Sequence, residues 1–229
     1  MNDYSEKIAI TTGDKLGIGK ELTKKALDIL KIKRDDVLII GGGISGLMAA
    51  YRLSSLNKQM KIALLDKGFP IEKRKCLVTD DSPCKHCKIC SITNGFAGAG
   101  AFSDGKFNIG TAYGGTLADE LGEKVANAYI GYADEVVTRF TPRNVSIGIY
   151  GTNEDLKTKC LQNGLQLLDM KTKHLGTENN FTIMSNLISW LKVQGISLFD
   201  RKEVDEIEEK DEGGNGICLR HSFLICPAK

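Results

Sequence analysis

The sequence lacks features that mark several classes of protein. Its 31 basic and 29 acidic side chains give a formal net charge of only +2, which creates no strong field for nucleic acid or a membrane surface. Aromatic residues make up 7% of the chain, with one tryptophan, which argues against a surface that stacks bases. No apolar run approaches the roughly 18 residues that a membrane helix needs. We therefore expect no nucleic-acid partner and no membrane span.

The opening of the sequence does not have the layout expected of a signal peptide. This opening, MNDYSEKIAITTGDK, is polar and does not place a basic segment before an apolar one. The seven cysteines are an odd number in a chain without an export signal, so they are interpreted as reduced thiols. The 229 residues, 41% of them hydrophobic, suffice for one good core. These features predict a soluble, cytoplasmic protein.

What the sequence does contain is a glycine motif between a predicted strand and a predicted helix. Residues 37–40 are an aliphatic run typical of a buried parallel strand, and residues 44–53 have the apolar spacing of a helix. Between them, Gly41 makes a tight turn and Gly43 lets the backbone approach a pyrophosphate, while Gly46 lets the helix pack closely. The helix N-terminus offers unpaired N–H groups to the phosphates.

An acid follows the next predicted strand. Residues 61–65 form this strand, and Asp66 comes directly after it, twenty residues beyond Gly46. A carboxylate here can accept hydrogen bonds from both ribose hydroxyls of an adenosine, and its charge disfavours the 2′-phosphate of NADP. The order of strand, glycines, helix, strand and acid predicts a bound dinucleotide, either FAD or NAD.

A second glycine-rich stretch covers residues 95–106. Its glycines are Gly95, Gly98, Gly100 and Gly105. Such a stretch cannot fill a core, but it suits a backbone that approaches a ligand closely; the alternative is a mobile surface loop. Ser103 and Asp104 could hydrogen-bond a ribityl or phosphate group, or simply form a turn.

From about residue 36 to about residue 210, the chain resembles a family of FAD-dependent dehydrogenases in the glutathione-reductase-like flavoprotein superfamily. The segments that carry the resemblance are VLIIGGGISGLMAA, LLDKGFPIEKRKC, CKHCKICSITNGFAGAGAFSDGKFN, YGGTLADELG, IYGTNEDLK and KHLGTEN. The resemblance implies an α/β, Rossmann-like FAD-binding domain with the ADP half of FAD on the first glycine loop. The residues expected to bind the cofactor are Gly41, Gly42, Gly43, Ile44, Ser45, Gly46, Asp66, Gly98, Ser103, Asp104 and Gly105.

The N-terminus departs from this family. Residues 7–40 resemble the opening of 4-hydroxythreonine-4-phosphate dehydrogenase of vitamin B6 synthesis, but nothing downstream supplies that enzyme's later metal and substrate residues. The stretch predicts a strand, a glycine turn and an amphipathic helix, followed by a charged joint at residues 31–36. We therefore divide the chain into a βα extension, residues 1–34, and an FAD-binding domain, residues 35–229.

The C-terminal part is expected to contain a helix, a strand and a hairpin. The predicted ranges are 182–194 for the helix, 196–199 for the strand, and 204–208 and 217–220 for the hairpin. Asn179 or Asn180 is the expected helix cap. The resemblance identifies the strand as the third of the core sheet and the hairpin as the start of a β-meander, so the domain is expected to be truncated.

Four of the seven cysteines lie within fifteen residues: Cys76, Cys84, Cys87 and Cys90. The last three have the spacing that opens a ferredoxin run, and four cysteines could equally form a tetrahedral zinc site. Lys85 and Lys88 would favour thiolates, which bind metals. The four thiols therefore predict zinc or an iron–sulfur cluster, with free or redox-active thiols as the alternatives.

The expected function is that of an FAD-binding oxidoreductase with an unspecified substrate and NAD(P)H as a candidate reductant. His174, in KHLGTEN, is a candidate proton donor or a solvated loop residue. The alternative functions are a non-catalytic nucleotide- and metal-binding fragment and a fragment of a vitamin B6 biosynthetic dehydrogenase.

Overall fold

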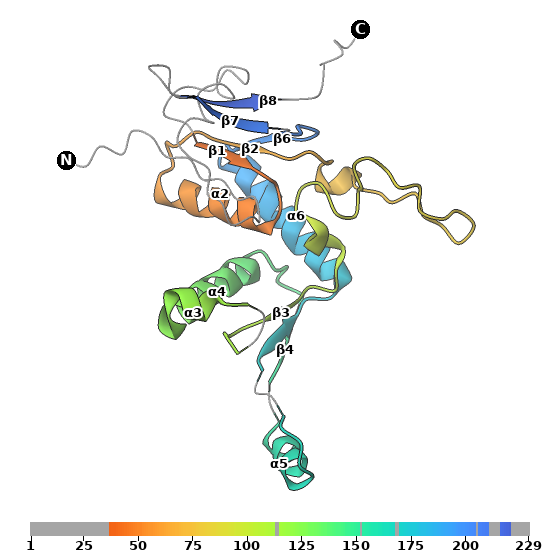
Figure 1. Cartoon of the computed structure of the whole chain (residues 1–229), viewed down its shortest axis with the longest axis vertical. Coiled ribbons are helices and arrows are strands. Elements are labelled where there is room, and N and C mark those ends of the chain that lie inside the picture. The colour runs from red at the N-terminus through yellow and green to blue at the C-terminus, as the bar shows by residue number, and fades with distance from the viewer. Residues whose placement is uncertain are drawn as a thin grey trace, which may run out of the picture. The chain divides into compact units, whose positions relative to one another are not determined.

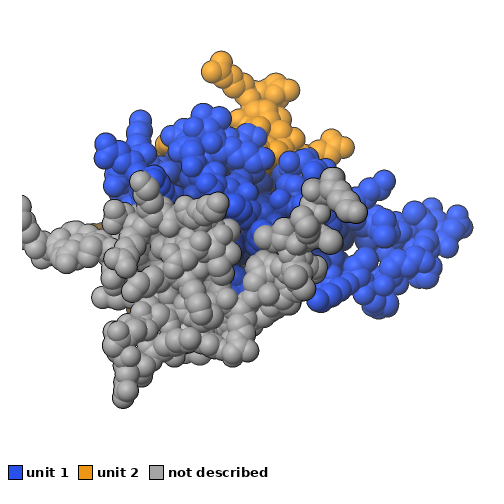
Figure 2. Space-filling model, turned by 90° about the horizontal axis from the view of Figure 1, so that it is seen from above, with its two compact units in different colours: residues 1–100, 187–229 blue, residues 101–186 orange. Residues whose placement is uncertain are grey.

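The computed structural model describes residues 37–112, 115–151, 153–167 and 170–204, together with the backbone of residues 206–210 and 216–220. The predicted extension at residues 1–34 lies outside these residues. The chain divides into two compact units, coloured separately in Figure 2. Unit 1 contains residues 1–100 and 187–229, and unit 2 contains residues 101–186.

Unit 1 is built on a parallel sheet of three strands. They are β1 (Val37–Ile40), β2 (Ile62–Leu65) and β6 (Ser197–Phe199), in the order β1-β2-β6. Helix α2 (Ile44–Leu56) connects β1 to β2 and lies along one face of the sheet (Figure 1). The predicted α/β class is confirmed, with the parallel βαβ unit typical of Rossmann-like FAD-binding domains.

The core of unit 1 lies between the sheet and its helices. Leu38 of β1 and Leu64 of β2 are fully buried, as expected for aliphatic runs in parallel strands. The predicted apolar face of α2 is buried as well, and its Tyr51 ring stacks on Trp190 with centroids 4.9 Å apart. Each fully buried leucine stabilises the fold by about 1.5–3 kcal/mol.

Trp190 belongs to helix α6 (Thr177–Val193), which begins earlier than predicted. The prediction that Asn179 or Asn180 caps this helix is wrong, because the N–H of Asn180 already donates to Gly176 O inside the first turn, at 2.8 Å. The Asn180 side chain is 5% exposed and donates instead to the carbonyl of Ser103. An N-cap residue lies just before the first helical turn, whereas Asn180 lies within that turn, so its side chain is not placed to cap the helix.

The predicted C-terminal hairpin is present. Strands β7 (Glu206–Lys210) and β8 (Gly216–Arg220) pair antiparallel, while the glycine turn between them lies outside the described residues. Two short 3₁₀ helices, η1 (Ile71–Lys73) and η2 (Ala99–Phe102), follow β2 along the chain.

Unit 2 contains an antiparallel sheet that the sequence did not suggest. Its strands are β3 (Lys106–Asn108), β5 (Thr172–His174) and β4 (Gly148–Tyr150), in that order. Unit 2 also contains α3 (Leu117–Leu121), α4 (Glu123–Arg139), α5 (Glu154–Gln162) and the first part of α6, residues 177–186. The buried amino group of Lys173 on β5 donates to Asp134 and to Thr138, which joins the sheet to α4.

Helices that could cross a membrane, in length and apolar character together, do not occur in the described part of the chain.

Candidate functional site

The glycine loop joins β1 to α2 in unit 1 and begins with a turn that favours glycine. Gly41 has φ +101°, a backbone conformation that residues with a Cβ rarely adopt. Its N–H donates to Leu65 O at 2.8 Å, which ties the turn to β2. Gly46 is buried on α2, as close helix packing requires. The roles expected of these two glycines fit this geometry.

Gly42 and Gly43 differ in what surrounds them. A Cβ on Gly42 would lie 2.7 Å from the ring of Phe96, so this glycine makes room for another part of the protein. A Cβ on Gly43 would meet no atom of the described residues within 4 Å. Gly43 is also the N-cap residue of α2, and no side chain caps the helix there. The uncapped helix end therefore faces open space at Gly43, where the following residues Ile44 and Ser45 are exposed.

Asp66 lies at the end of β2 and braces the glycine loop. It is 9% exposed, and its Oδ2 accepts the N–H of Gly42 at 2.8 Å. Its Oδ1 accepts the N–H of Gly68 at 2.7 Å. A carboxylate has about four acceptor positions, so these two bonds leave capacity for hydroxyl donors. The sequence predicted the ribose acceptor but not the bracing bonds.

The first part of the second glycine-rich stretch lies against the glycine loop. Phe96 and Ala97 are each 2% exposed, and the Ala97 N–H donates to Gly42 O at 2.7 Å. A Cβ on Gly98 would be 3.3 Å from the Cα of Gly43. The alternative of a mobile surface loop is therefore wrong for residues 95–98, which are packed and hydrogen-bonded within unit 1.

Residues 101–106 of that stretch belong to unit 2, and residues 103–106 form a local turn. Ser103 Oγ accepts the N–H of Gly105 at 3.2 Å, and Asp104 pairs with the amino group of Lys106 at 2.7 Å. The hydrogen bond from Lys106 lowers the pKa of the Asp104 carboxyl, and the nearby His174 contributes. These contacts are those of the turn alternative, and cofactor binding by Ser103, Asp104 and Gly105 stays a prediction.

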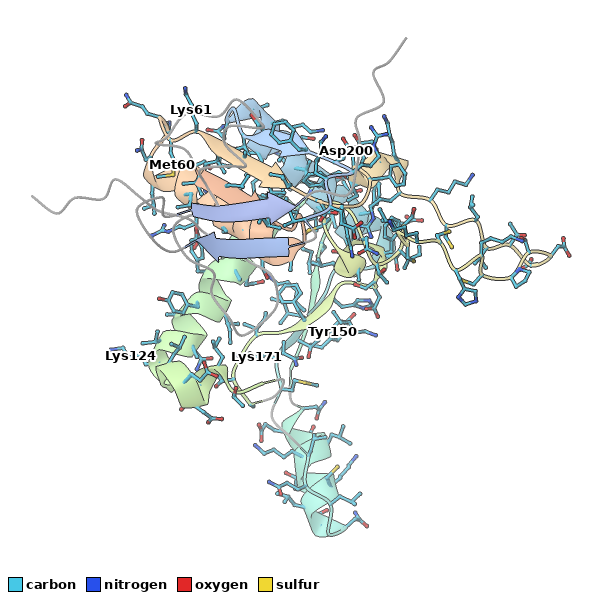
Figure 3. The ribbon with its side chains drawn as sticks, turned by 45° about the horizontal axis from the view of Figure 1, so that its top comes forward. Met60, Lys61, Lys124, Tyr150, Lys171 and Asp200 are labelled. Atoms are coloured by element: carbon cyan, nitrogen blue, oxygen red, sulfur yellow. The ribbon has the colours of Figure 1, made fainter. Side chains whose placement is uncertain are left out.

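His174 lies beside this turn. Its Nε2 is 3.8 Å from the Asp104 carboxylate, and its ring is 6.4 Å from that of Tyr150, which Figure 3 labels. The histidine therefore has an acid and a phenol as neighbours within unit 2. Its role as a proton donor stays a prediction.

Arg74, directly after η1, is a residue of this site that the sequence reasoning missed. It is 5% exposed, and its guanidinium donates to four backbone carbonyls. The acceptors are Ser91 O at 2.9 Å and Phe96 O, Gly98 O and Ile92 O at 2.7 Å each. Burial lowers the pKa of Arg74, and the charges of Asp66 and Cys90 oppose that shift. No local pattern distinguishes this arginine from the other basic residues of the chain.

The four cysteines lie in a long loop that extends from unit 1 between η1 and η2 (Figures 1 and 3). All four are free; Cys76, Cys84 and Cys87 are exposed, and Cys90 is half-buried. Within the described residues, which include these four, no three His, Cys, Asp or Glu side chains form a group that could hold a metal ion. The structure does not bring the thiols together, and the metal site stays a prediction.

Cys90 differs from its neighbours in its electrostatic surroundings. The backbone N–H groups of Thr93 and Ile92 and the hydroxyl of Thr93 lower the pKa of the Cys90 thiol, and the charge of Arg74 contributes. Donors aimed at sulfur stabilise the thiolate, which is the nucleophilic form.

Residues 36–73 match the family model described as DAO, FAD dependent oxidoreductase. The matched residues contain β1, the glycine loop, α2, β2, Asp66 and η1. No curated protein matches the chain.

Several solved structures are similar to the chain at low sequence identity. L-amino acid deaminase from Proteus myxofaciens is 17% identical with a TM-score of 0.34, over 82% of this chain and 42% of that one. A 3-ketosteroid-Δ4-(5α)-dehydrogenase from Rhodococcus jostii is 14% identical with a TM-score of 0.49, over 82% and 42%. Glycine oxidase from Bacillus cereus is 15% identical with a TM-score of 0.41, over 82% and 51%. The chain thus spans about half the length of these structures or less.

Proposed function

We propose that this chain forms the FAD-binding part of an FAD-dependent oxidoreductase. The observation that carries the proposal is the open position at Gly43, at the uncapped N-terminus of α2 and beside the loop that Asp66 braces. These residues lie in the segment that matches the family model of FAD dependent oxidoreductases. When bound, FAD would supply hydride or electron transfer, while the protein supplies binding and orientation.

The residues present fit the ADP half of FAD. Gly43 has room for a pyrophosphate oxygen close to the backbone, and the N–H groups of Ile44 and Ser45 belong to the first turn of α2, where negative charge is stabilised. The unused acceptor capacity of Asp66 suits the ribose hydroxyls, and its charge disfavours NADP. Gly98, which packs against Gly43, would form part of the wall beside the pyrophosphate.

The test is a set of titrations in which ligands are added to the purified protein and binding is measured by intrinsic fluorescence and by calorimetry. We expect FAD and ADP to bind and FMN, which lacks the adenosine and one phosphate, to bind much more weakly. Preference for FMN over FAD would contradict the assignment to this loop. Tight binding of NAD⁺ without binding of FAD would show that the proposed cofactor is wrong but that a dinucleotide does bind.

Turnover needs a separate measurement, because binding alone is also the property of a non-catalytic fragment. The FAD-loaded protein is mixed anaerobically with NADH or NADPH, and the flavin absorbance is followed. Bleaching faster than that of free FAD would support an oxidoreductase that accepts electrons from a nicotinamide. An unchanged spectrum with both would leave a nucleotide-binding protein or an enzyme with another reductant, and candidate organic substrates would then be compared.

A further inference from the structure

Arg74 is a charged side chain inside unit 1, with 5% of its surface exposed. A buried guanidinium is tolerated only where its donors are satisfied. Its acceptors include four backbone carbonyls between residues 91 and 98. The stem of the side chain also passes under Gly95, where a Cβ would lie 2.8 Å from Arg74 Cδ. The arginine thus organises one short segment of backbone.

That segment includes a conformation that must be held in place. Ala97 has φ +71°, in the left-handed region that disfavours residues with a Cβ. The carbonyls on both sides of it, Phe96 O and Gly98 O, each accept a hydrogen bond from the same Arg74 nitrogen at 2.7 Å. Arg74 therefore fixes the backbone immediately before and after the strained residue.

The held segment in turn contacts the glycine loop. The N–H of Ala97 donates to Gly42 O, and Gly98 lies against Gly43, the residue with open space at its Cβ position. The Phe96 ring fills the space next to Gly42. A displacement of residues 96–98 would therefore change the wall beside the position proposed for the pyrophosphate.

We propose that Arg74 is a positioning residue of the cofactor site, which holds residues 96–98 against Gly42 and Gly43 so that FAD meets a pre-formed wall. This inference rests on the proposed function. Lysine cannot take this role, because an ammonium group is a compact charge and lacks the planar fork that reaches several carbonyls at once.

The first test needs no cofactor. Arg74→Met and Arg74→Lys are compared with the wild type and with Lys75→Met, which changes the exposed neighbouring residue. Hydrogen exchange is measured by NMR in the FAD-free protein. We expect the Ala97 amide to exchange about ten-fold faster in both Arg74 variants, with β1 and β2 amides unchanged, because only a local opening is made easier. Unchanged protection at Ala97 would overturn the positioning role.

The second test asks whether the held segment matters to the cofactor. FAD, ADP and adenosine are titrated against the same four proteins. We expect Arg74→Met to weaken FAD and ADP about ten-fold and to leave adenosine unchanged, because the segment adjoins the position of the phosphates. An equal loss of affinity for adenosine would overturn the proposal. Adenosine has no phosphate, so Arg74 would then act on the ribose site at Asp66 and not on the wall beside the phosphates.

The melting temperature distinguishes a role of Arg74 in overall stability from a role in positioning the cofactor site. A lower melting temperature with unchanged FAD affinity of the folded protein would also overturn the proposal. If Arg74→Met does not fold, Arg74→Lys, which keeps the charge, gives the same comparison. If the wild type binds no FAD or ADP, the proposed function fails, while hydrogen exchange at Ala97 still decides whether Arg74 holds the segment.

Discussion

The glycine loop, residues 41–46, and the cysteine loop, residues 76–90, both belong to unit 1. Only the glycine loop is held in a defined conformation by strands, a helix and side chains around it. Each loop contains one residue type at a regular spacing, glycine in the first and cysteine in the second. The glycine loop is enclosed by β1, α2 and Asp66, and Phe96 packs onto it. Three of the four cysteines are exposed, and the loop has no regular element between η1 and η2 beyond one isolated bridge at Thr79 and Ser82.

The difference shows what makes a spacing motif informative. A spacing fixes geometry only where the backbone that carries it is regular or is held by other parts of the fold. The strand before Gly41 and the helix after Gly43 do this for the glycines. For the cysteines, the held part of the chain begins at the last of them, Cys90, whose carbonyl accepts the N–H of Asn94. It continues with the carbonyls that Arg74 binds, from Ser91 onward. Substitutions in the two loops should therefore have very different effects.

The largest effect is expected for Gly43→Val. The backbone of Gly43, with φ −66° and ψ 178°, suits any residue, and its Cβ position is open. Valine is a poorer N-cap than glycine, so the melting temperature of the FAD-free protein should fall by only about 2–4 °C. The valine would occupy the place of the pyrophosphate, and FAD affinity should fall about 100-fold or more. Titration of FAD and thermal melting of the FAD-free protein check both halves.

Gly42→Ala is the matched control, because its added Cβ meets the Phe96 ring at 2.7 Å. Overpacking should reduce the folding stability of the FAD-free protein by about 1–3 kcal/mol, and its melting temperature should fall accordingly. Equal behaviour of the two variants would mean that Gly42 and Gly43 do not have the distinct roles that the structure gives them.

The next largest effect is expected for Asp66→Ala. This change removes the acceptor of two backbone N–H groups, those of Gly42 and Gly68, and each unsatisfied donor costs about 1–3 kcal/mol of folding stability. FAD should also bind about ten- to a hundred-fold more weakly, because the ribose acceptor is lost. Urea unfolding of the FAD-free protein and FAD titration measure the two losses.

Asp66→Asn separates the two functions of this side chain. The amide keeps one oxygen, so it can still accept one of the two bracing bonds, and the loss of stability should be smaller than for alanine. Full wild-type FAD affinity in both variants would contradict the assignment of Asp66 to the ribose.

The sequence predicted those parts of unit 1 in which local pattern and final environment agree. The aliphatic runs of β1 and β2, the glycine turn and the apolar face of α2 are all short-range signals, and the structure contains each of them. Helix α6 begins at Thr177, earlier than predicted, and the partner of the Asn180 side chain is a carbonyl at residue 103, far away in the sequence. Arg74 could not be found for the same reason, since its acceptors lie 17 to 24 residues further along the chain.

The sheet of unit 2 was not predicted for a related physical reason. Its strands have three residues each, which is too short for an alternation of apolar and polar residues to show. Lys106 pairs with His174 across a large separation in sequence, and β4 is mostly exposed. Such strands form because of their partners rather than their own composition.

A smaller effect is expected in the pH dependence of Cys90. Donors from Thr93 and Ile92 lower the pKa of its thiol in the folded protein, so its thiolate fraction at a given pH exceeds that in the unfolded chain. The alkylation rate of Cys90, followed by mass spectrometry, should therefore rise at a lower pH in the native protein than in urea. The linked stability is present above the unfolded pKa and is lost as pH falls through the folded one.

Thr93→Val tests the cause, because it removes the hydroxyl donor while keeping the backbone N–H. It should move the alkylation profile of Cys90 part of the way toward that of the unfolded chain. Identical native and unfolded profiles in the wild type would show that the end of the cysteine loop is no more ordered than its exposed part.

The smallest effect is expected when Cys76, Cys84 and Cys87 are replaced together by serine. All three are exposed, and substitutions at such positions usually change stability by no more than about 0.5 kcal/mol. The melting temperature of metal-free protein and its FAD affinity should therefore match the wild type. Elemental analysis of anaerobically purified wild type and variant tests the metal site that the spacing predicts. About one equivalent of zinc, or the iron of one cluster, present in the wild type and lost in the variant, would establish that site. The cysteine loop would then be ordered by its ligand, whereas the glycine loop is ordered by the fold before any ligand binds.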